Sequence, residues 1–266
     1  MNRILLTTLM LLAGGPLLTA QYYHSQQSRL PSLDKSFSVV AHIVRDTSGN
    51  EGIGEAQILE SIDTLNFYFQ PIGLHFEVCE FRYIDNFQYN KPLNTNEWEE
   101  MQVKYHQNNR INVFFVQDIP WAPDDCGYTT NAGITMTDAG GVMIKKFCVA
   151  TIPKALTHEF GHYFGLLHTN EGFGTELVNG ENCETEGDLI CDTPADPYAT
   201  GDTLVGKYIT LQACRFILAK TDANGEFYRP HVANIMSYYP EECKCGFSYE
   251  QYLRMVATFR MSTGVW

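Results

Sequence analysis

The sequence predicts one domain of mixed α+β structure, and three observations lead to this prediction. Strand-like and helix-like patterns of apolar residues alternate through the first half of the chain. From Gly172 to Arg229 this periodicity is lost and Gly, Asp, Asn, Thr and Pro predominate, which indicates loops held by something other than a packed core. Helical periodicity returns near the C-terminus, and no linker separates independent domains.

The first strand and the first helix are predicted from neighbouring patterns. Phe37 to Val44 is largely apolar and favours a strand. An apolar face at helical spacing follows, and Pro71 ends that helix because proline cannot continue its hydrogen bonds. The face consists of Ile58, Ile62, Leu65 and Phe69.

Three further strands are predicted. Leu74 to Phe81 alternates apolar and polar residues, as in a strand with one buried face. Ile111 to Val116 is continuously apolar enough to be a central strand, and Gly141 to Ile144 is a shorter candidate.

Two more helices complete the prediction. A short one contains Trp98, Met101 and Tyr105. The last begins where Ser248 and Gln251 have the spacing of a capping box. Its apolar stripe is formed by Tyr252, Met255, Val256 and Phe259.

Charge and cysteine content exclude one class of partner and indicate a compartment. The chain has 18 Lys and Arg against 31 Asp and Glu, a formal net charge of −13, which would repel a phosphate backbone. Nucleic acid is therefore not expected as a partner. Eight cysteines are typical of a secreted protein held by disulfides, and no CxxC pair indicates a cysteine–zinc site.

The N-terminus has the pattern of a secretory signal peptide over residues 1–20. Arg3 precedes the apolar stretch Ile4 to Leu12, and Ala20 is a small residue suited to cleavage. The apolar run is too short for a bilayer, which needs roughly 20 residues, so no membrane anchor is expected. We expect a secreted protein, periplasmic if bacterial, with a cysteine-free leader or short pro-segment over 21–36 and a catalytic domain over 37–266.

The most informative segment runs from Thr157 to His168. On a helix, His158 and His162 leave the same face one turn apart, so both imidazoles can bind a single zinc ion. Glu159 would lie beside that metal. A carboxylate there can accept a proton from the attacking water and later deliver it to the leaving amine.

A third histidine completes the predicted zinc site. His168 lies ten residues after His158, and a straight helix would carry it about 15 Å along the axis. Gly165 can take a positive φ, end the helix and turn His168 back toward the same metal. Three neutral imidazoles leave zinc an open position, as in a catalytic site.

Other glutamates and histidines of the chain are weaker candidates for this metal. Glu184 or Glu186 could serve as the third ligand in place of His168, but Gly165 at its fixed offset argues against this. The other histidines lack metal-ligand spacing and are expected at the surface or in an ordinary core. They are His24, His42, His75, His106 and His231.

The sequence resembles the metzincin clan of zinc peptidases. HEFGHYFGLLH at 158–168 matches the HExxHxxGxxH signature, and Asn234 to Tyr238 resembles the Met-turn. Gly187 to Pro194 is similar to the GDxxxDTP segment of the pappalysin family within that clan. The spacings after the Met-turn also match that family, at Cys243, Phe247, Gln251, Arg254 and Met255.

This resemblance implies a secreted zinc endopeptidase, expected as a monomer acting on peptide or protein substrates. A twisted sheet with backing and active-site helices (about 37–165) would lie above a cleft, with a loop-rich lower subdomain and C-terminal helix (about 166–266) below it. The resemblance assigns zinc to the three histidines and the general base and acid to Glu159. It implies that Met236 supports the metal from below and that Tyr238 hydrogen-bonds the tetrahedral intermediate.

The resemblance also implies calcium in the lower subdomain. Asp188, Asp192 and Thr193 offer oxygen ligands of suitable hardness, although backbone carbonyls or waters must complete the shell. A charge-rich solvated loop is the alternative.

The cysteines follow the same division of the chain. Cys126 and Cys148 form a plausible bridge near the cleft. The family pattern favours bridges among four others, with the pairing left open, and Cys245 has no counterpart. These four are Cys183, Cys191, Cys214 and Cys243.

Two departures from the family pattern affect the pocket. Ser237 stands where aspartate is common, and Lys244 stands where methionine is common. Some relatives prefer a basic residue just after the cut, and Glu241 and Glu242 are candidates to bind it. A strand within 132–144 is expected to offer an unpaired edge to the substrate.

The competing function is a zinc-stabilised binding or adhesion module without turnover. Such a module would be expected to keep the metal ligands and lose Glu159, which is present here. Hydrolysis of peptide bonds is therefore the leading prediction.

Overall fold

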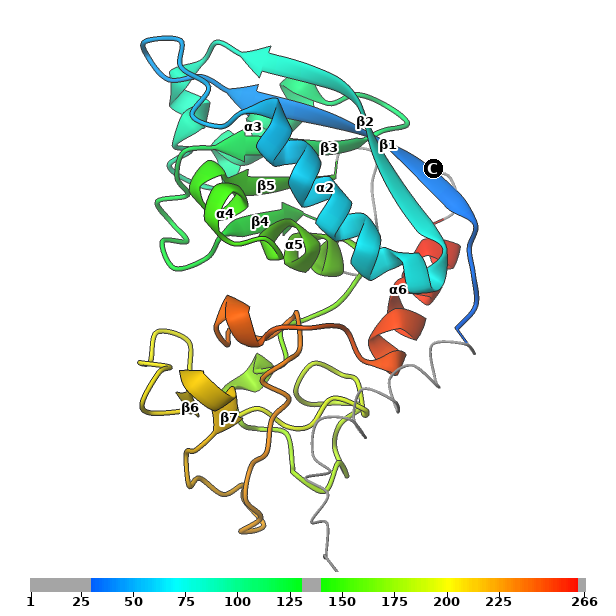
Figure 1. Cartoon of the computed structure of the whole chain (residues 1–266), viewed down its shortest axis with the longest axis vertical. Helices are drawn as coiled ribbons and strands as arrows, with labels where there is room; N and C mark the ends of the chain where they lie inside the picture. Colours follow the sequence, from blue (N-terminus) through cyan, green and yellow to red (C-terminus); the bar gives the residue numbers. More distant parts are fainter. Residues whose placement is uncertain (1–29, 131–139, 263–266) are drawn as a thin grey trace, which may run out of the picture.

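The computed structural model describes residues 30–130 and 140–262. The predicted signal peptide, most of the leader and residues 132–139 of the expected edge segment lie outside these ranges. Five strands form one sheet in the order β2-β1-β3-β5-β4, with β4 antiparallel and the other pairings parallel (Figure 1). The strands are β1 (Lys35–Val44), β2 (Leu74–Ile84), β3 (Ile111–Val116), β4 (Gly127–Thr130) and β5 (Gly141–Lys145).

Helices cover both faces of this sheet. The α-helices are α2 (Glu55–Phe69), α3 (Thr95–Tyr105), α4 (Lys146–Thr151), α5 (Ala155–Tyr163) and α6 (Tyr249–Met261). Side chains of α2 and α5 belong to one apolar cluster with the odd-numbered residues of β1 and β3, whereas α3 packs on the opposite face with Phe114 and Val116. All six residues of β3 are buried, because a central parallel strand is covered on both sides.

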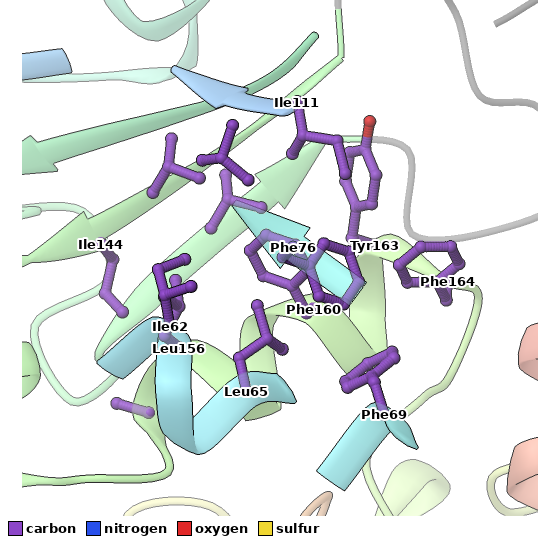
Figure 2. Packing of buried hydrophobic residues seen from close by; sticks show 14 of the residues in the cluster. Ile62, Leu65, Phe69, Phe76, Ile111, Ile144, Leu156, Phe160, Tyr163 and Phe164 are labelled. Carbon is purple, nitrogen blue, oxygen red and sulfur yellow. The ribbon is translucent and has the colours of Figure 1, made fainter. Parts of the chain in front are cut away.

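The core beneath the sheet is rich in aromatic rings, several of which are labelled in Figure 2. Phe76 of β2 lies edge-on to Phe160 of α5, with ring centroids 5.0 Å apart, and Phe69 of α2 meets Phe76 at 5.4 Å. Such pairs add roughly 0.5–1.5 kcal/mol each to the burial of their area. They fix α5, and therefore the zinc-site histidines that it carries, against the sheet.

The C-terminal helix confirms its predicted cap. The hydroxyl of Ser248 accepts a hydrogen bond from Gln251 N–H, and the Gln251 side chain accepts one from Ser248 N–H. Met255 and Val256 are buried in the same cluster as α2 and α5, and the hydroxyl of Tyr252 donates to the carbonyl of Tyr68. This last helix of the chain therefore belongs to the core of the sheet half.

Below the sheet the chain from Thr169 to Cys245 is mainly loop (Figure 1). Regular structure there is limited to β6 (Ile209–Thr210), β7 (Arg215–Phe216) and the 3₁₀ turns η3 (Glu171–Phe173), η4 (Leu211–Ala213) and η5 (Glu241–Cys243). Two further 3₁₀ turns lie in the sheet half, η1 (Gln70–Ile72) and η2 (Phe87–Asn90). A small separate apolar cluster forms around Tyr198, Tyr208, Ile209 and Tyr239, so this half does have a modest core.

Three disulfides cross-link the described residues. Cys126 pairs with Cys148, which confirms the bridge expected near the cleft. The pairing left open by the sequence is Cys183 with Cys191 and Cys214 with Cys243. Cys79 and Cys245 are free and exposed.

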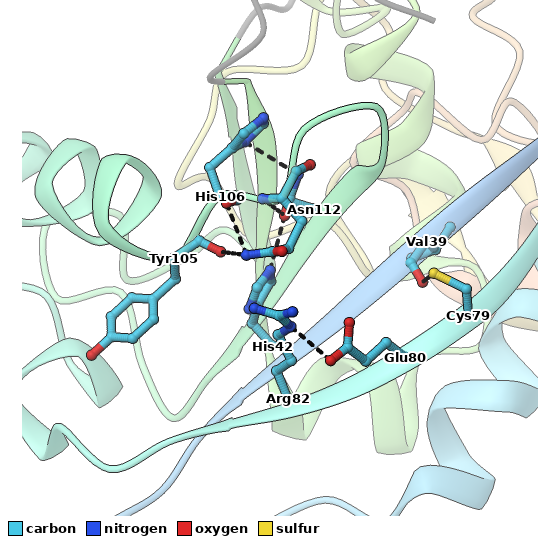
Figure 3. Close-up of polar contacts among 9 residues, drawn as sticks. Val39, His42, Cys79, Glu80, Arg82, Tyr105, His106 and Asn112 are labelled. Carbon is cyan, nitrogen blue, oxygen red and sulfur yellow. Dashed lines mark hydrogen bonds and ion pairs between the residues drawn. The ribbon is translucent and has the colours of Figure 1, made fainter.

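Two of the histidines without metal-ligand spacing stabilise the sheet (Figure 3). His42 of β1 is fully buried, its ring stacks on Phe114, and its Nε2 lies 2.9 Å from Asn112 Oδ1. The Asn112 amide also donates to Nδ1 of His106, at 3.2 Å. Burial lowers the pKa of His42 to about 4, so this network holds a neutral imidazole.

No described helix is both long enough and apolar enough to span a bilayer.

Candidate active site

Helix α5 divides its side chains between the core and the cleft. Leu156, Phe160 and Tyr163 are buried in the apolar cluster of the sheet half. His158 and His162 occupy the opposite face and line a cavity of about 520 Å³ below the sheet. The same amphipathic pattern that anchors the helix therefore aims both imidazoles outward.

The turn at Gly165 is built as the sequence predicts. Gly165 has φ of 86°, its N–H donates to His162 O at 2.9 Å, and Leu166 N–H donates to Gly161 O at 3.0 Å. These two bonds form a Schellman motif, which ends the helix. A Cβ at Gly165 would also lie 2.6 Å from Thr258 Oγ1 of α6, so glycine is required both for conformation and for space.

This turn brings His168 onto the two helical histidines. The three Nε2 atoms lie 3.1 Å (His158 to His162), 3.2 Å (His158 to His168) and 3.0 Å (His162 to His168) apart. Zinc bound tetrahedrally at about 2.0–2.1 Å would require separations of roughly 3.3 Å. Within the described ranges these residues are the one group of His, Cys, Asp and Glu side chains close enough to share a metal.

Backbone carbonyls orient two of these rings. Nδ1–H of His158 donates to Ile235 O and Nδ1–H of His162 donates to Leu166 O, each at 2.8 Å. Both Nε2 atoms are therefore left with free lone pairs that point to a common position. Burial lowers the pKa of all three imidazoles, that of His162 to about 4, so they are neutral as metal ligation requires. The donor set and its geometry fit zinc.

Glu159 is buried beside the histidines, at 4% exposure. One carboxylate oxygen accepts a hydrogen bond from Thr129 Oγ1 of β4 at 2.9 Å. A Cβ at Gly127 would approach the Glu159 carboxyl carbon to 2.5 Å, so β4 can lie this close only because residue 127 is glycine. Burial raises the pKa of Glu159 to about 8.

The predicted Met-turn lies against α5. Met236 is fully buried, and a Cβ at Gly161 would lie 2.4 Å from its sulfur atom. Gly161 thus allows the methionine to pack between the turns that carry His158 and His162. The turn is held by Asn234, whose Oδ1 accepts from Met236 N–H at 2.8 Å.

Tyr238 lines the cleft next to the third histidine. Its ring centroid lies 4.6 Å from that of His168, and its hydroxyl donates to Asp125 Oδ1 at 2.9 Å. Asp125, which the sequence pattern does not single out, lies in the segment just before β4 and shares the cavity wall with Tyr238. No spacing relation could have revealed a contact across more than a hundred residues.

The structure bears on three of the interpretations made from the sequence. The part of the expected segment that the structure describes forms β5, which pairs with both β3 and β4, so the sheet edge that borders the cavity is β4. Glu184 and Glu186 are exposed and outside the histidine group, so neither is the third ligand. Glu241 lines the cavity and is paired with Lys154, whereas Glu242 is exposed and does not line the cavity.

The residues considered for calcium have different hydrogen-bond partners. Asp188 is buried and accepts hydrogen bonds from Thr193 Oγ1 at 2.8 Å and from Ile190 N–H at 3.1 Å. Asp192 instead accepts from Ser248 Oγ and from Glu250 N–H, so its carboxylate stabilises the N-terminus of α6. Asp192 is thus engaged at the start of α6, while its charge still contributes to the raised pKa of Asp188.

The site has the arrangement of a metzincin-type metalloprotease. Two histidines lie one helical turn apart, a glycine turn brings back the third, and a buried glutamate lies at an open strand edge. The family model described as pregnancy-associated plasma protein-A, a peptidase family, matches residues 88–260. That match covers well over half of the chain, and the chain belongs to this family, the pappalysins.

Curated relatives are fungal. The chain is 27% identical over 184 residues to "Extracellular metalloprotease 1" of Coccidioides posadasii, covering 64% of this chain and 61% of that protein. It is 25% identical over 240 residues to "Extracellular metalloprotease" of Colletotrichum graminicola, covering 84% of this chain and 74% of that one. The matched region thus spans about three fifths of the first relative's length.

One solved structure is also similar, metalloproteinase-II from Bacteroides fragilis. It has 11% sequence identity and a TM-score of 0.40, and the match covers 54% of this chain and 46% of that one. This likeness is too weak to extend what the chain's own fold shows.

Proposed function

We propose that this protein is a secreted zinc-dependent endopeptidase that hydrolyses peptide bonds of extracellular proteins. The observation that carries the proposal is the convergence of three neutral Nε2 atoms beside a buried carboxylate in one cleft. His158, His162 and His168 would hold the zinc ion. When bound, zinc supplies Lewis acidity, which polarises the scissile carbonyl and makes water acidic enough to attack at neutral pH.

Glu159 is proposed to move the proton. Its carboxylate accepts a proton from the attacking water and returns it to the leaving amine. The hydrogen bond from Thr129 holds that carboxylate in place through the reaction. A dication at the histidines favours the ionised form and so acts against the effect of burial on its pKa.

The other residues of the cleft are proposed to bind the substrate. An extended peptide can add to the free edge of β4, of which Gly127, Tyr128 and Thr129 border the cavity. The Tyr238 hydroxyl lies in the same cavity, and by leaving Asp125 it could donate to the oxyanion of the tetrahedral intermediate.

Secretion is supported by the disulfides and by the relatives. Cross-links persist in oxidising compartments, and this chain has three among its described residues. Both fungal relatives are named as extracellular proteins. The apolar segment within residues 1–20 is proposed to direct export.

We keep calcium as a second, structural metal in this proposal, near Asp188. The carboxylate of Glu176 packs against Gly187, where a Cβ would lie 2.1 Å from Glu176 Oε2. Burial and mutual repulsion raise the pKa of Glu176 to about 8, and burial raises that of Asp188 to about 7. A hard dication would relieve this repulsion, with backbone carbonyls or waters completing its ligands.

The test of the proposed function combines a peptide library with a single substitution. Purified mature protein loaded with zinc should cut a diverse library, and a zinc chelator should abolish cutting. Glu159→Gln should lower the rate by about 10³-fold while the variant still binds one zinc ion, because a general base typically contributes 10²–10⁴-fold. Glu242→Gln, the same chemical change at an exposed position outside the cavity, serves as the matched control.

The outcomes separate the two functions weighed from the sequence. Cutting that persists in Glu159→Gln would overturn the assigned base. Zinc binding with no cutting of any peptide by the unmodified protein would favour a binding or adhesion module instead.

A further inference from the structure

A lysine lines the cleft close to the three histidines. Lys244 follows the 3₁₀ turn η5 and is among the residues that line the 520 Å³ cavity. The lining of the same cavity also includes the apolar residues Ile152, Ala155 and Pro240 and the acid Glu241. The cavity thus combines apolar wall with the cationic side chain of Lys244.

Among the residues that the structure describes, the ammonium of Lys244 is held in no ion pair or hydrogen bond, although the charges of Glu241 and Glu159 act on it from a distance. Its positive charge is close enough to contribute to the lowered pKa of His158, His162 and His168. Burial lowers the pKa of Lys244 itself to about 8, so the side chain is still mostly protonated at neutral pH.

Glu241 is the acid with the largest electrostatic effect on Lys244, but its hydrogen bonds and its ion pair are made with Lys154. Glu241 Oε1 accepts from the Lys154 backbone N–H at 2.9 Å and from the Lys154 ammonium at 3.0 Å. Both side chains of this ion pair are less than 20% exposed, so the pair is largely shielded from solvent. The remaining cavity carboxylates outside Glu159, those of Asp124 and Asp125, come from the segment before β4, and Asp125 is engaged by Tyr238.

We propose that Lys244 makes this pocket selective for a substrate carboxylate, so that peptides with Glu or Asp just after the cut are preferred. The inference rests on the proposed endopeptidase function. A carboxylate entering the pocket gains the unpaired ammonium in partly desolvated surroundings, where a charge-assisted hydrogen bond is strong. An arginine or lysine side chain would place two positive charges together and is disfavoured.

The experiment compares peptides that differ only in the residue just after the cut, with Glu, Gln, Leu or Arg there. Glu and Gln have the same shape, so their ratio isolates the charge. We expect kcat/KM for the Glu peptide to exceed that for Gln by about tenfold, with Arg the poorest. Lys244→Met should bring the Glu to Gln ratio to about one, while Lys244→Arg should keep the preference and Glu242→Gln should leave it unchanged.

Several results would overturn the inference. One is equal cleavage of the Glu and Gln peptides by the unmodified protein. Another is a preference that persists in Lys244→Met, with Lys244→Gln made as a second variant in case Lys244→Met does not fold. A third is an equal loss of rate on all peptides in these variants, since that would mean a catalytic or structural role rather than selectivity.

A binding measurement separates this inference from the proposed function. The zinc-loaded Glu159→Gln variant should bind the Glu peptide about tenfold more tightly than the Gln peptide, measured by fluorescence anisotropy. Binding of both with equal affinity would refute the role of Lys244 whether or not the unmodified protein cuts peptides. Selective binding without any cutting would retain the pocket assignment and reject the peptidase.

Discussion

The sheet half and the loop half of this protein are stabilised by different kinds of interaction. In the sheet half, a continuous apolar cluster joins β1, α2, α5 and the C-terminal α6. In the loop half no large apolar cluster forms among the described residues, and the loops are held by two disulfides, a small tyrosine-rich cluster and buried carboxylates. The proposed zinc site depends on both halves, because two histidines come from α5 and the third lies at the start of the loops.

At the junction between the halves, hydrogen bonds hold the segment that carries the third histidine. Directly after the third histidine, Thr169 N–H donates to Met236 O and the Thr169 hydroxyl donates to Asp196 at 3.1 Å. Asp196 also accepts from the hydroxyl of Tyr239 at 2.9 Å. The loop half therefore positions its histidine through a buried polar network, which is strong only while every member is satisfied.

The largest effect is expected where the halves join. Gly165→Ala introduces strain at a positive φ and a clash with Thr258, and together these should lower the free energy of unfolding by about 3–4 kcal/mol. Gly180→Ala is the matched control, since Gly180 also has positive φ but has nothing within 4 Å of its Cβ position. Denaturant unfolding and zinc titration of both variants would test this; equal losses would mean that the clash is irrelevant.

The next largest effect comes from removing a cross-link in the loop half. Replacing Cys214 and Cys243 with serine opens a loop of 29 residues and should cost about 3–4 kcal/mol by the chain-entropy argument. Limited proteolysis should then cut between Thr169 and Cys245 before it cuts the sheet. Replacing Cys126 and Cys148, with a separation of 22, should instead loosen β4 beside the cleft. Identical cutting patterns in the two variants would contradict the division into halves.

A smaller effect is expected from the polar junction. Asp196→Ala leaves the hydroxyls of Thr169 and Tyr239 without their acceptor, which should cost about 2 kcal/mol. Zinc affinity, measured by competition with a chelator, should fall roughly tenfold because such supporting contacts typically contribute 10–100-fold. Asp202→Asn, at a site whose partners Lys207 and Tyr208 lie far from the metal ligands in the chain, should leave zinc affinity unchanged.

The smallest effect concerns pH and calcium in the loop half. The folded-state pKa values of Asp188 and Glu176 are raised, to about 7 and about 8, above ordinary carboxyl values near 4. The folded state therefore binds more protons between about pH 4 and pH 8, so stability falls as pH rises through this window. Calcium should restore protease resistance at pH 8 and matter little at pH 5. Resistance that does not depend on calcium at pH 8 would remove calcium from the proposal.

Much of the zinc site was predictable because its information is local. Helical spacing places His158 and His162, and the steric freedom of Gly165 explains the return of His168. The elements of the sheet were predictable for the same reason, since apolar periodicity reports the burial of neighbouring residues. The loop half could be recognised as loops, but the disulfide pairing within it could not be derived.

What local patterns could not supply are contacts between distant segments. The edge strand that borders the cavity is β4 and not its neighbour β5, because pairing order is decided by packing across the whole sheet. Asp125 meets Tyr238, and Glu241 meets Lys154, across long stretches of chain. The last pairing gives Glu241 a partner within the protein, which is the observation behind the proposed preference for an acidic substrate residue.

The sequence by itself determined the metal chemistry: three histidines at fixed offsets around one glycine turn, with a glutamate beside them. Tertiary structure alone decided what surrounds that chemistry, including the strand edge, the buried state of Glu159 and the free ammonium of Lys244. The physical reason is the separation along the chain of the residues that interact. Backbone geometry relates residues within a few turns, whereas burial and ion pairing depend on which distant segments the fold brings together.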